Sequence, residues 1–287
     1  MNLKDFTTLL IVSILWGGSF LFLRLLVRDG LEPLQIVSLR MLLAAIFITP
    51  FFILKMKKYS FYDHGFPFLL IGILNTALPF TLFSYAALSL GPGSLSILQA
   101  TVPILTALIL FSLYRGEFSY FKLTGVLIGL LGLFSLVGPS GNLDLFSSML
   151  CVIASLSYAI AGVYLSKTPA RMSNSFIGMG SIIVGAIVLL PFVFFYSDRM
   201  ATITSTSWVY LALLGIINTS LAYVLFIKLI KRIGPINASF VTYLVPVSSI
   251  FLGIAYDGEQ FPADKIIGTL LIFLGVFFAN KQKAADK

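Results

Sequence analysis

Long apolar runs alternate with short polar segments along the whole chain, and ten such runs can be counted. Most of them have the ~20 residues that an α-helix needs to cross the hydrocarbon layer of a bilayer. Lipid cannot satisfy backbone polar groups, so helices are expected throughout. The pattern therefore predicts an all-α integral membrane protein with ten transmembrane helices. The predicted spans are 6–26, 34–54, 65–88, 94–114, 121–138, 144–165, 174–196, 207–228, 235–256 and 264–280.

The second half of this pattern repeats the first. Gly-Ile-Leu-Asn-Thr-Ala-Leu begins at Gly72, and Gly-Ile-Ile-Asn-Thr-Ser-Leu begins at Gly215, 143 residues later. The same offset relates further Gly and Pro positions, and the Gly-Glu pairs at 116 and 258 are offset by 142. Self-similarity at a fixed period indicates a duplicated structural unit. We expect two five-helix units, residues 1–140 and 141–287.

The basic residues predict how the helices are oriented, because cytoplasmic segments of membrane proteins are enriched in Lys and Arg. Of the 19 basic residues, 14 lie in alternate segments that share one side of the membrane, and four lie on the other side. The larger set comprises Lys4, Lys55, Lys57, Lys58, Arg115, Lys122, Lys167, Arg171, Lys228, Lys231, Arg232, Lys281, Lys283 and Lys287. Both termini are therefore expected to be cytoplasmic, in a multi-pass protein of the inner or plasma membrane.

An odd number of spans in each unit has a geometrical consequence. The second five-helix unit must cross the membrane in the opposite direction to the first, which makes an inverted repeat around a central cavity. Two such units can exchange conformations, which is the basis of alternating access in transporters. The alternative is an ancestral duplication that serves only packing.

Composition narrows the function further. The chain is 59% hydrophobic and only 10% charged, whereas soluble domains contain about 25% charged residues. The chain has a net charge of +8, and its basic residues lie mainly in the segments between apolar runs. Membrane association explains this distribution better than nucleic-acid binding does. Cys151 and His64 are the only residues of their types, which argues against disulfides, thiolate metal sites and His-based catalysis. We expect no metal, no cofactor and no enzymatic activity.

The order of several motifs resembles that of the drug/metabolite transporter superfamily, and of its EamA-type ten-helix exporters in particular. The motifs are Trp16-Gly17, Pro33 to Arg40, Gly-Pro at 91 and 234, Pro103 and Pro246, the two Gly-Glu pairs, and the glycine-spaced fifth and tenth spans. The resemblance covers essentially the whole chain. It implies a basket of ten helices that exports small metabolites, such as amino acids, or drugs.

Polar side chains within the spans are candidates for substrate binding, since each is unfavourable in lipid unless it is paired or hydrated. Asn75 and Asn218 are repeat equivalents, and their amides can serve either a pocket or a clamp between helices. Gln99 has Thr242 as its counterpart. That difference between the copies favours Gln99 as a substrate contact.

Aromatic side chains form a second group of candidates. Trp16 lies in mid-span, away from the interface where tryptophan usually anchors, and Tyr158 is its repeat equivalent. Such rings can stack on a flat or cationic substrate, and helix packing is the alternative. Tyr85 and Tyr243 are further candidates.

Arg40 is the only charged residue well within a span. It can bind a substrate carboxylate, or it can reach outwards to pair with Asp29 or Glu32. All 11 acidic residues lie at termini, in loops or at span ends. A proton-coupled pump usually keeps a carboxylate within the membrane, so facilitated export or exchange is expected.

Two structural roles complete the predictions. Pro103 and Pro246 can kink their helices and act as hinges. Gly125, Gly129 and Gly132 allow another helix to approach closely, either within the chain or across the seam of a homodimer. The expected partners are therefore a small-molecule substrate and the lipid bilayer, with a second copy as the partner if the glycine stripe forms a homodimer seam, but no nucleic acid.

Two other functions remain open at this point. A lipid or amphiphile flippase of the same superfamily would carry the same motifs and would need an apolar lateral opening. A membrane-embedded enzyme would need clustered acids or an activated nucleophile at one membrane face, and the sequence contains no such cluster.

Overall fold

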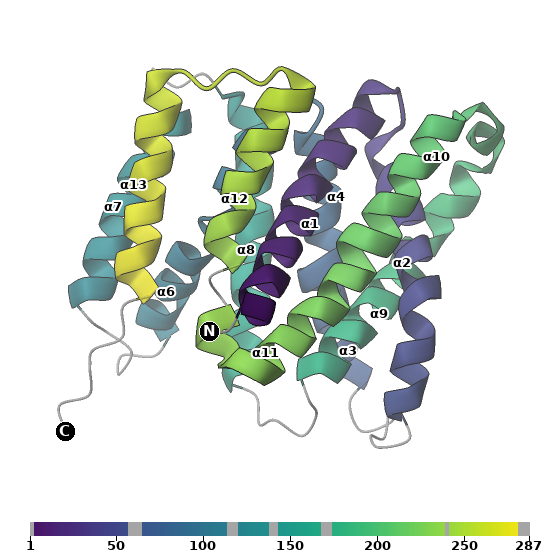
Figure 1. Cartoon of the computed structure of the whole chain (residues 1–287), viewed down its shortest axis with the longest axis horizontal. Coiled ribbons are helices and arrows are strands. Elements are labelled where there is room, and N and C mark those ends of the chain that lie inside the picture. The colour runs from purple at the N-terminus through teal and green to yellow at the C-terminus, as the bar shows by residue number, and fades with distance from the viewer. Residues whose placement is uncertain are drawn as a thin grey trace.

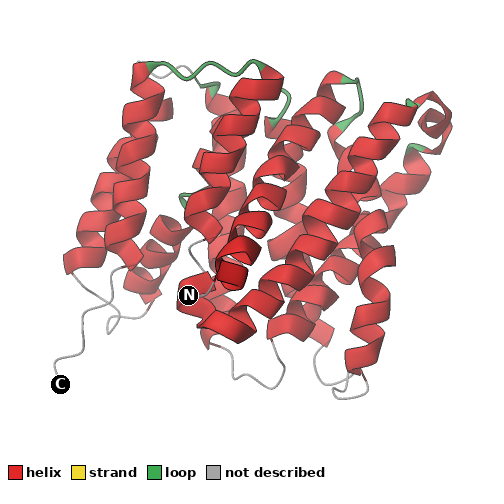
Figure 2. Cartoon of the chain, in the orientation of Figure 1, coloured by secondary structure: helices red, strands yellow, loops and turns green. Residues whose placement is uncertain are grey.

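The computed structural model describes residues 3–56, 65–113, 120–137, 143–167, 174–238 and 241–280. These residues are almost entirely helical, and no strand occurs among them (Figure 2). The helices run side by side, roughly across the longest axis of the bundle (Figure 1). The start of α1 and the end of α13 lie at the same end of the bundle, the lower one in Figure 1.

The predicted spans 6–26, 34–54, 144–165 and 174–196 correspond to single long helices. They are α1 (Leu3–Arg28), α2 (Pro33–Met56), α8 (Leu145–Lys167) and α9 (Asn174–Phe195). The fifth and tenth predicted spans correspond to α7 (Tyr120–Val137) and α13 (Ala263–Asn280). A short 3-10 segment, η4 (Ser197–Thr202), follows α9.

The other predicted spans are interrupted helices. The third consists of α3 (Gly65–Gly72), the π-helical η2 (Ile73–Ala77) and α4 (Leu78–Ala86). The fourth consists of α5 (Pro92–Gln99) and α6 (Val102–Leu113). The last two interrupted spans are α10 (Ser205–Ala212), η5 (Leu213–Leu221) and α11 (Ala222–Ala238), then α12 (Val241–Leu252) and η6 (Gly253–Asp257).

One predicted boundary was wrong. The apolar pattern ends one span at residue 228 and begins the next at 235, but α11 continues through Gly234 and Pro235 to Ala238. A helix can pass through a proline if it gives up the hydrogen bond to the residue four positions earlier. At the repeat-equivalent position, Gly91 is extended and Pro92 begins α5.

Seven stretches of helix among the described residues are long and apolar enough to cross a membrane, and three apolar stretches are shorter. The shorter ones are Leu123–Ser135, Val241–Asp257 and Lys265–Phe278. Large apolar side chains also cover the outside of the bundle, among them Leu131 and Phe134 on α7 and Phe194 on α9. An apolar surface of this extent is typical of a protein whose solvent is lipid.

Helices from the two halves of the sequence interdigitate. α2 packs against α9, α7 against α13, and α1 against α11 and α12. α8, in turn, contacts α4, α5 and α6. The core is therefore built jointly by both halves.

The glycines of α7 lie in a tight crossing with α13 (Figure 1). A Cβ added at Gly275 would stand 2.6 Å from the backbone of Gly129, and one added at Gly132 would stand 2.8 Å from the Gly268 oxygen. Side chains cannot be accommodated at such distances, so glycine is required for this approach. The sequence left open an internal contact or a dimer seam for this stripe, and the structure forms the internal contact.

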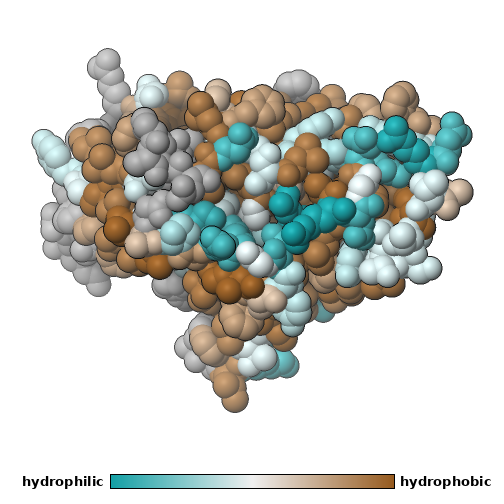
Figure 3. All heavy atoms as spheres, turned by 90° about the horizontal axis from the view of Figure 1, so that it is seen from above, coloured by the Kyte–Doolittle hydropathy of each residue, from teal (hydrophilic) through white to brown (hydrophobic). Residues whose placement is uncertain are grey.

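Hydrophilic side chains gather over the middle and the right of the upper end of the bundle (Figure 3). Arg28 Nη1 lies 2.7 Å from Asp257 Oδ1, and Arg199 Nη1 lies 3.1 Å from Glu32 Oε1. Apolar side chains follow much of the outline of the same face (Figure 3). The end of the bundle is thus polar and its sides are apolar.

Candidate functional site

A cavity of about 470 Å³ lies between the two halves of the chain. Its walls are formed by residues of α1, α2, η2, α4, α5, α6, α8, α9, η5, α11, α12 and α13. The volume is in the range of small-molecule sites, which run from about 300 to 1,000 Å³. The predicted residues that line this cavity are Trp16, Arg40, Asn75, Gln99, Pro103, Tyr158, Asn218, Tyr243 and Pro246.

Asn75 and Asn218 both lie on π-helical segments, η2 and η5. A π-helical turn shifts the hydrogen-bond register locally, and such turns often occur at functional sites. Pro79 follows η2 and cannot donate to the carbonyl of Asn75, which favours the irregular turn there. η5 has no such proline, because Ala222 stands at the equivalent position.

The two asparagine amides face the cavity without a protein partner. Neither side chain forms a hydrogen bond with another described residue, and neither contains a fully occluded polar atom. The same holds for Gln99. In this conformation the asparagines therefore do not clamp two helices together, and their donors and acceptors remain available.

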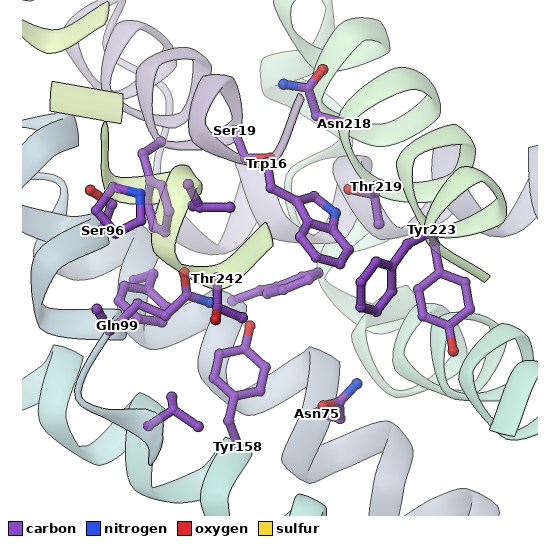
Figure 4. Close-up of a pocket in the computed structure, with 18 of the residues that line it drawn as sticks. Trp16, Ser19, Asn75, Ser96, Gln99, Tyr158, Asn218, Thr219, Tyr223 and Thr242 are labelled. Atoms are coloured by element: carbon purple, nitrogen blue, oxygen red, sulfur yellow. The ribbon is translucent and has the colours of Figure 1, made fainter. Parts of the chain in front are cut away.

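Trp16 lines the cavity, and the residue that follows it is a glycine. A Cβ at Gly17 would lie 2.1 Å from Ser248 Oγ, so Gly17 allows α12 to pack closely against α1. Ser248 Oγ donates to the Ser13 carbonyl at 2.9 Å and strengthens this crossing. The Trp16 ring lies against Phe226, with 4.8 Å between centroids. Figure 4 shows the indole extending into the space between the helices.

Gln99 lies at the end of α5, where the helix is interrupted before Pro103. Because Pro103 lacks an N–H, it cannot donate to the Gln99 carbonyl four residues earlier. Pro246 occupies the equivalent position in α12, but that helix continues through it. The repeats therefore differ at this point in backbone as well as in side chain, and Figure 4 shows Gln99, Thr242 and the Tyr158 hydroxyl facing one region.

Arg40 is buried, with 6% of its surface exposed. The expected pairing with Asp29 or Glu32 was wrong: Asp29 accepts from Ser207 Oγ, and Glu32 pairs with Arg199. Arg40 Nε instead donates to Thr219 Oγ1 at 3.0 Å, and its Cζ lies 3.8 Å from the centroid of the Phe80 ring. Burial between α2, α4 and η5 holds the guanidinium at the cavity wall.

The remaining predicted aromatics lie in different places. Tyr85 is not part of the cavity wall and is 37% exposed. Tyr243 lines the cavity, and its hydroxyl donates to the Val276 carbonyl at 3.4 Å.

Sequence reasoning missed Phe80 and Thr219, the two side chains that contact Arg40 and hold it in place. Thr219 follows Asn218 in the repeated motif, so its position was a usable signal. Nothing in the sequence links Phe80 to Arg40, because the contact joins two separate helices.

Glu259 is held away from the cavity, at the polar end of the bundle. Its carboxylate accepts from the backbone N–H groups of Gly93, at 2.7 Å, and Ser94, at 3.0 Å, and so caps the start of α5. Lys265 Nζ lies 3.2 Å from the same carboxylate. The counterpart of Glu259 in the first half, Glu117, lies outside the described residues, as does His64.

Within the part of the chain that the structure describes, no three His, Cys, Asp or Glu side chains are grouped to hold a metal ion. The chemistry available at the cavity is therefore that of amides, hydroxyls, aromatic rings and one guanidinium. Such a set binds and orients a solute.

The model of the EamA-like transporter family matches residues 5–138 and 145–281. The chain belongs to this family. This confirms the resemblance seen in the motifs, and it identifies a membrane transporter family rather than an enzyme family. Together with the apolar helices, it supports a multi-pass membrane protein.

Relatives of this family member span nearly the same length. The chain is 25% identical to the uncharacterized transporter YoaV of Bacillus subtilis, covering 93% of each chain. It is 28% identical to the uncharacterized inner membrane transporter YedA of Escherichia coli K12, covering 88% of this chain and 83% of YedA. A solved crystal structure with 14% identity aligns with a TM-score of 0.62 over 98% of this chain and 97% of its own, which shows a common fold.

Proposed function

We propose that this protein exports small organic metabolites, such as amino acids, or drugs across the inner or plasma membrane by alternating access. The observation that carries the proposal is a cavity whose wall combines equivalent residues of both halves. Trp16 faces it with Tyr158, and Asn75 faces it with Asn218. A site at the interface of two repeats is the arrangement that alternating access requires.

The packing supports an inverted repeat of five helices in each half. Residues of the first span contact the eighth and ninth predicted spans, and the sixth span contacts the third and fourth. Exchanging the halves turns one set of contacts into the other, as a pseudo-two-fold axis requires. The family model also matches the chain twice, at 5–138 and 145–281, close to the proposed units 1–140 and 141–287.

The proposed orientation places both termini in the cytoplasm. α1 begins and α13 ends at the same end of the bundle (Figure 1). In the proposed topology, most basic residues lie at that end, as the enrichment of Lys and Arg in cytoplasmic segments predicts. Many of them fall in segments outside the described residues.

The test is binding and transport by purified protein. A thermal-shift screen with amino acids, nucleosides and cationic drugs should find compounds that raise the melting temperature, because a ligand stabilises the state that binds it. Compounds that bind are then followed in proteoliposomes. Replacing Trp16 and Gln99 together by leucine should abolish both the thermal shift and the transport.

The matched control is Trp208→Leu. Trp208 is the only other tryptophan of the chain, is 37% exposed on α10 and does not line the cavity. Its replacement should leave binding and transport intact. Unchanged transport by the Trp16/Gln99 double variant would refute the central site.

A further inference from the structure

Arg40 is the only charged side chain among the described residues that line the cavity. The carboxylates that the structure describes with partners are engaged elsewhere: Asp5 with Arg232, Asp29 with Ser207, Glu32 with Arg199, Asp144 with Ser147, Asp257 with Arg24 and Arg28, and Glu259 with Lys265. The cavity therefore contains a cation without a neighbouring protein anion. An uncompensated charge at membrane depth is unfavourable and is typical of a functional group.

The guanidinium is fixed on two sides and open on a third. Thr219 Oγ1 accepts from Nε at 3.0 Å and donates its own O–H to the Leu214 carbonyl at 2.7 Å. The face of the group lies 3.8 Å from the centroid of the Phe80 ring. A guanidinium has five N–H donors, so four of them, on the two Nη atoms, remain.

These remaining donors have no partner within the described residues. The bond to Thr219 is the only hydrogen bond that Arg40 makes there. The Nη atoms are also not sealed off, because the only unpaired and fully buried side-chain nitrogen or oxygen in the described part of the chain is Arg24 Nε. The two Nη atoms of a cavity-lining arginine can offer two parallel N–H groups, which match the two oxygens of a carboxylate.

The aromatic part of the cavity wall indicates what kind of group the ligand carries beside its anionic group. The rings of Phe80, Phe83 and Phe226 line the cavity together with Trp16 and Tyr158. Aromatic walls favour an apolar or flat group. The lone positive charge is balanced by a monoanion, whereas a phosphate monoester would leave an excess of negative charge, because the described lining residues include no second cation.

We propose that the cavity binds a small organic carboxylate, with its carboxyl group on the two Nη atoms of Arg40 and its apolar part against the aromatic wall. This inference rests on the proposed function and names the substrate class of the same site. Thr219 is a positioning residue, since its hydroxyl is already engaged by Arg40 Nε and the Leu214 carbonyl.

The experiment compares four probes of similar size with different head groups: phenylacetate, phenylacetamide, phenethylamine and phenyl phosphate. Binding to the purified full chain in detergent is measured by thermal shift and calorimetry. Phenylacetate should bind at least tenfold more tightly than each of the other three, as expected for a charge-assisted, bidentate contact.

Variants separate recognition from folding. Arg40→Met retains the bulk against Phe80 and should reduce the preference for phenylacetate over phenylacetamide about ten- to hundredfold, to near unity. Arg40→Lys keeps the positive charge but loses the planar pair of N–H donors, so it should retain part of the preference for phenylacetate over phenylacetamide. Thr219→Val should lower the preference less than Arg40→Met. Because the readout is a ratio of two affinities, general damage to the fold does not imitate the effect.

Three results would overturn the inference. They are tighter binding of phenyl phosphate or phenethylamine, no binding of phenylacetate by the wild type, and an unchanged preference in Arg40→Met. None of these would overturn transport itself, which depends on whether any solute of the wider screen binds and crosses the bilayer. The two proposals therefore fail on different measurements.

Discussion

At the scale of single residues, charged side chains are divided between two environments. Arg40 lies at the cavity wall with one hydrogen bond, whereas Glu259 is surrounded by two backbone N–H groups and Lys265. The side chains of Glu259 and Lys265 are only 5% and 10% exposed. In such a buried pair, removing one partner is strongly destabilising because it leaves the other charge buried without a counter-charge.

Replacing Glu259 by glutamine should therefore destabilise the protein. The change leaves Lys265 buried without its anion and weakens the cap of α5, so we expect a loss of about 3 kcal/mol. Chemical or thermal unfolding in detergent measures it. The matched control is Glu32→Gln in the exposed pair with Arg199, where the side chains are 49% and 59% exposed. That change should cost less than about 1 kcal/mol, and equal losses would argue against the buried pair.

At the scale of elements, interruptions of the helices place the functional groups. η2 and η5 bear Asn75 and Asn218, and the break between α5 and α6 bears Gln99. The tight crossings at Gly17 and at Gly275 connect helices that are distant in sequence. Regular packing at these crossings holds the irregular segments around one cavity.

The crossing of α7 and α13 should depend on the absence of a side chain at Gly275. In Gly275→Ala, the new Cβ would lie 2.6 Å from the backbone of Gly129, so the helices must separate, at a cost of roughly 1–3 kcal/mol. The melting temperature in detergent should fall. Gly162→Ala on α8 is the control, because nothing lies within 4 Å of the added atom. It should be neutral or stabilising by up to ~1 kcal/mol, and a similar fall in both variants would contradict the tight crossing.

At the scale of the whole molecule, the two halves enclose a site that neither half contains alone. Residues of both halves line the cavity, among them Trp16 and Gln99 from the first and Tyr158 and Asn218 from the second (Figure 4). No carboxylate lines it within the described residues. Hydrophilic side chains instead gather at the upper end of the bundle (Figure 3).

This distribution predicts how transport responds to a proton gradient. Without a carboxylate at the site to take up and release a proton, uphill transport should not follow a pH gradient imposed across proteoliposomes. Solute flux down its own gradient, or exchange against internal solute, should continue when the pH gradient is dissipated with an ionophore. Accumulation driven by the pH gradient alone would show that a proton-binding group acts in the cycle.

Much of the fold could be predicted from the hydrophobic pattern, because a lipid-exposed helix must be apolar along its length and its ends must be polar. The ranges of α1, α2, α8 and α9 agree closely with the predicted spans. The duplication pointed to Asn75 and Asn218, and family membership followed from the order of motifs. These features are local or periodic along the chain.

The partners of individual side chains were decided only in three dimensions. The position of Arg40 in the second span was evident, but the sequence could not show that Phe80 and Thr219 hold it, or that Glu32 belongs to Arg199. These contacts join helices up to 179 residues apart. Apolar periodicity specifies which residues form a helix, whereas helix crossings and π-helical turns determine what each polar side chain meets.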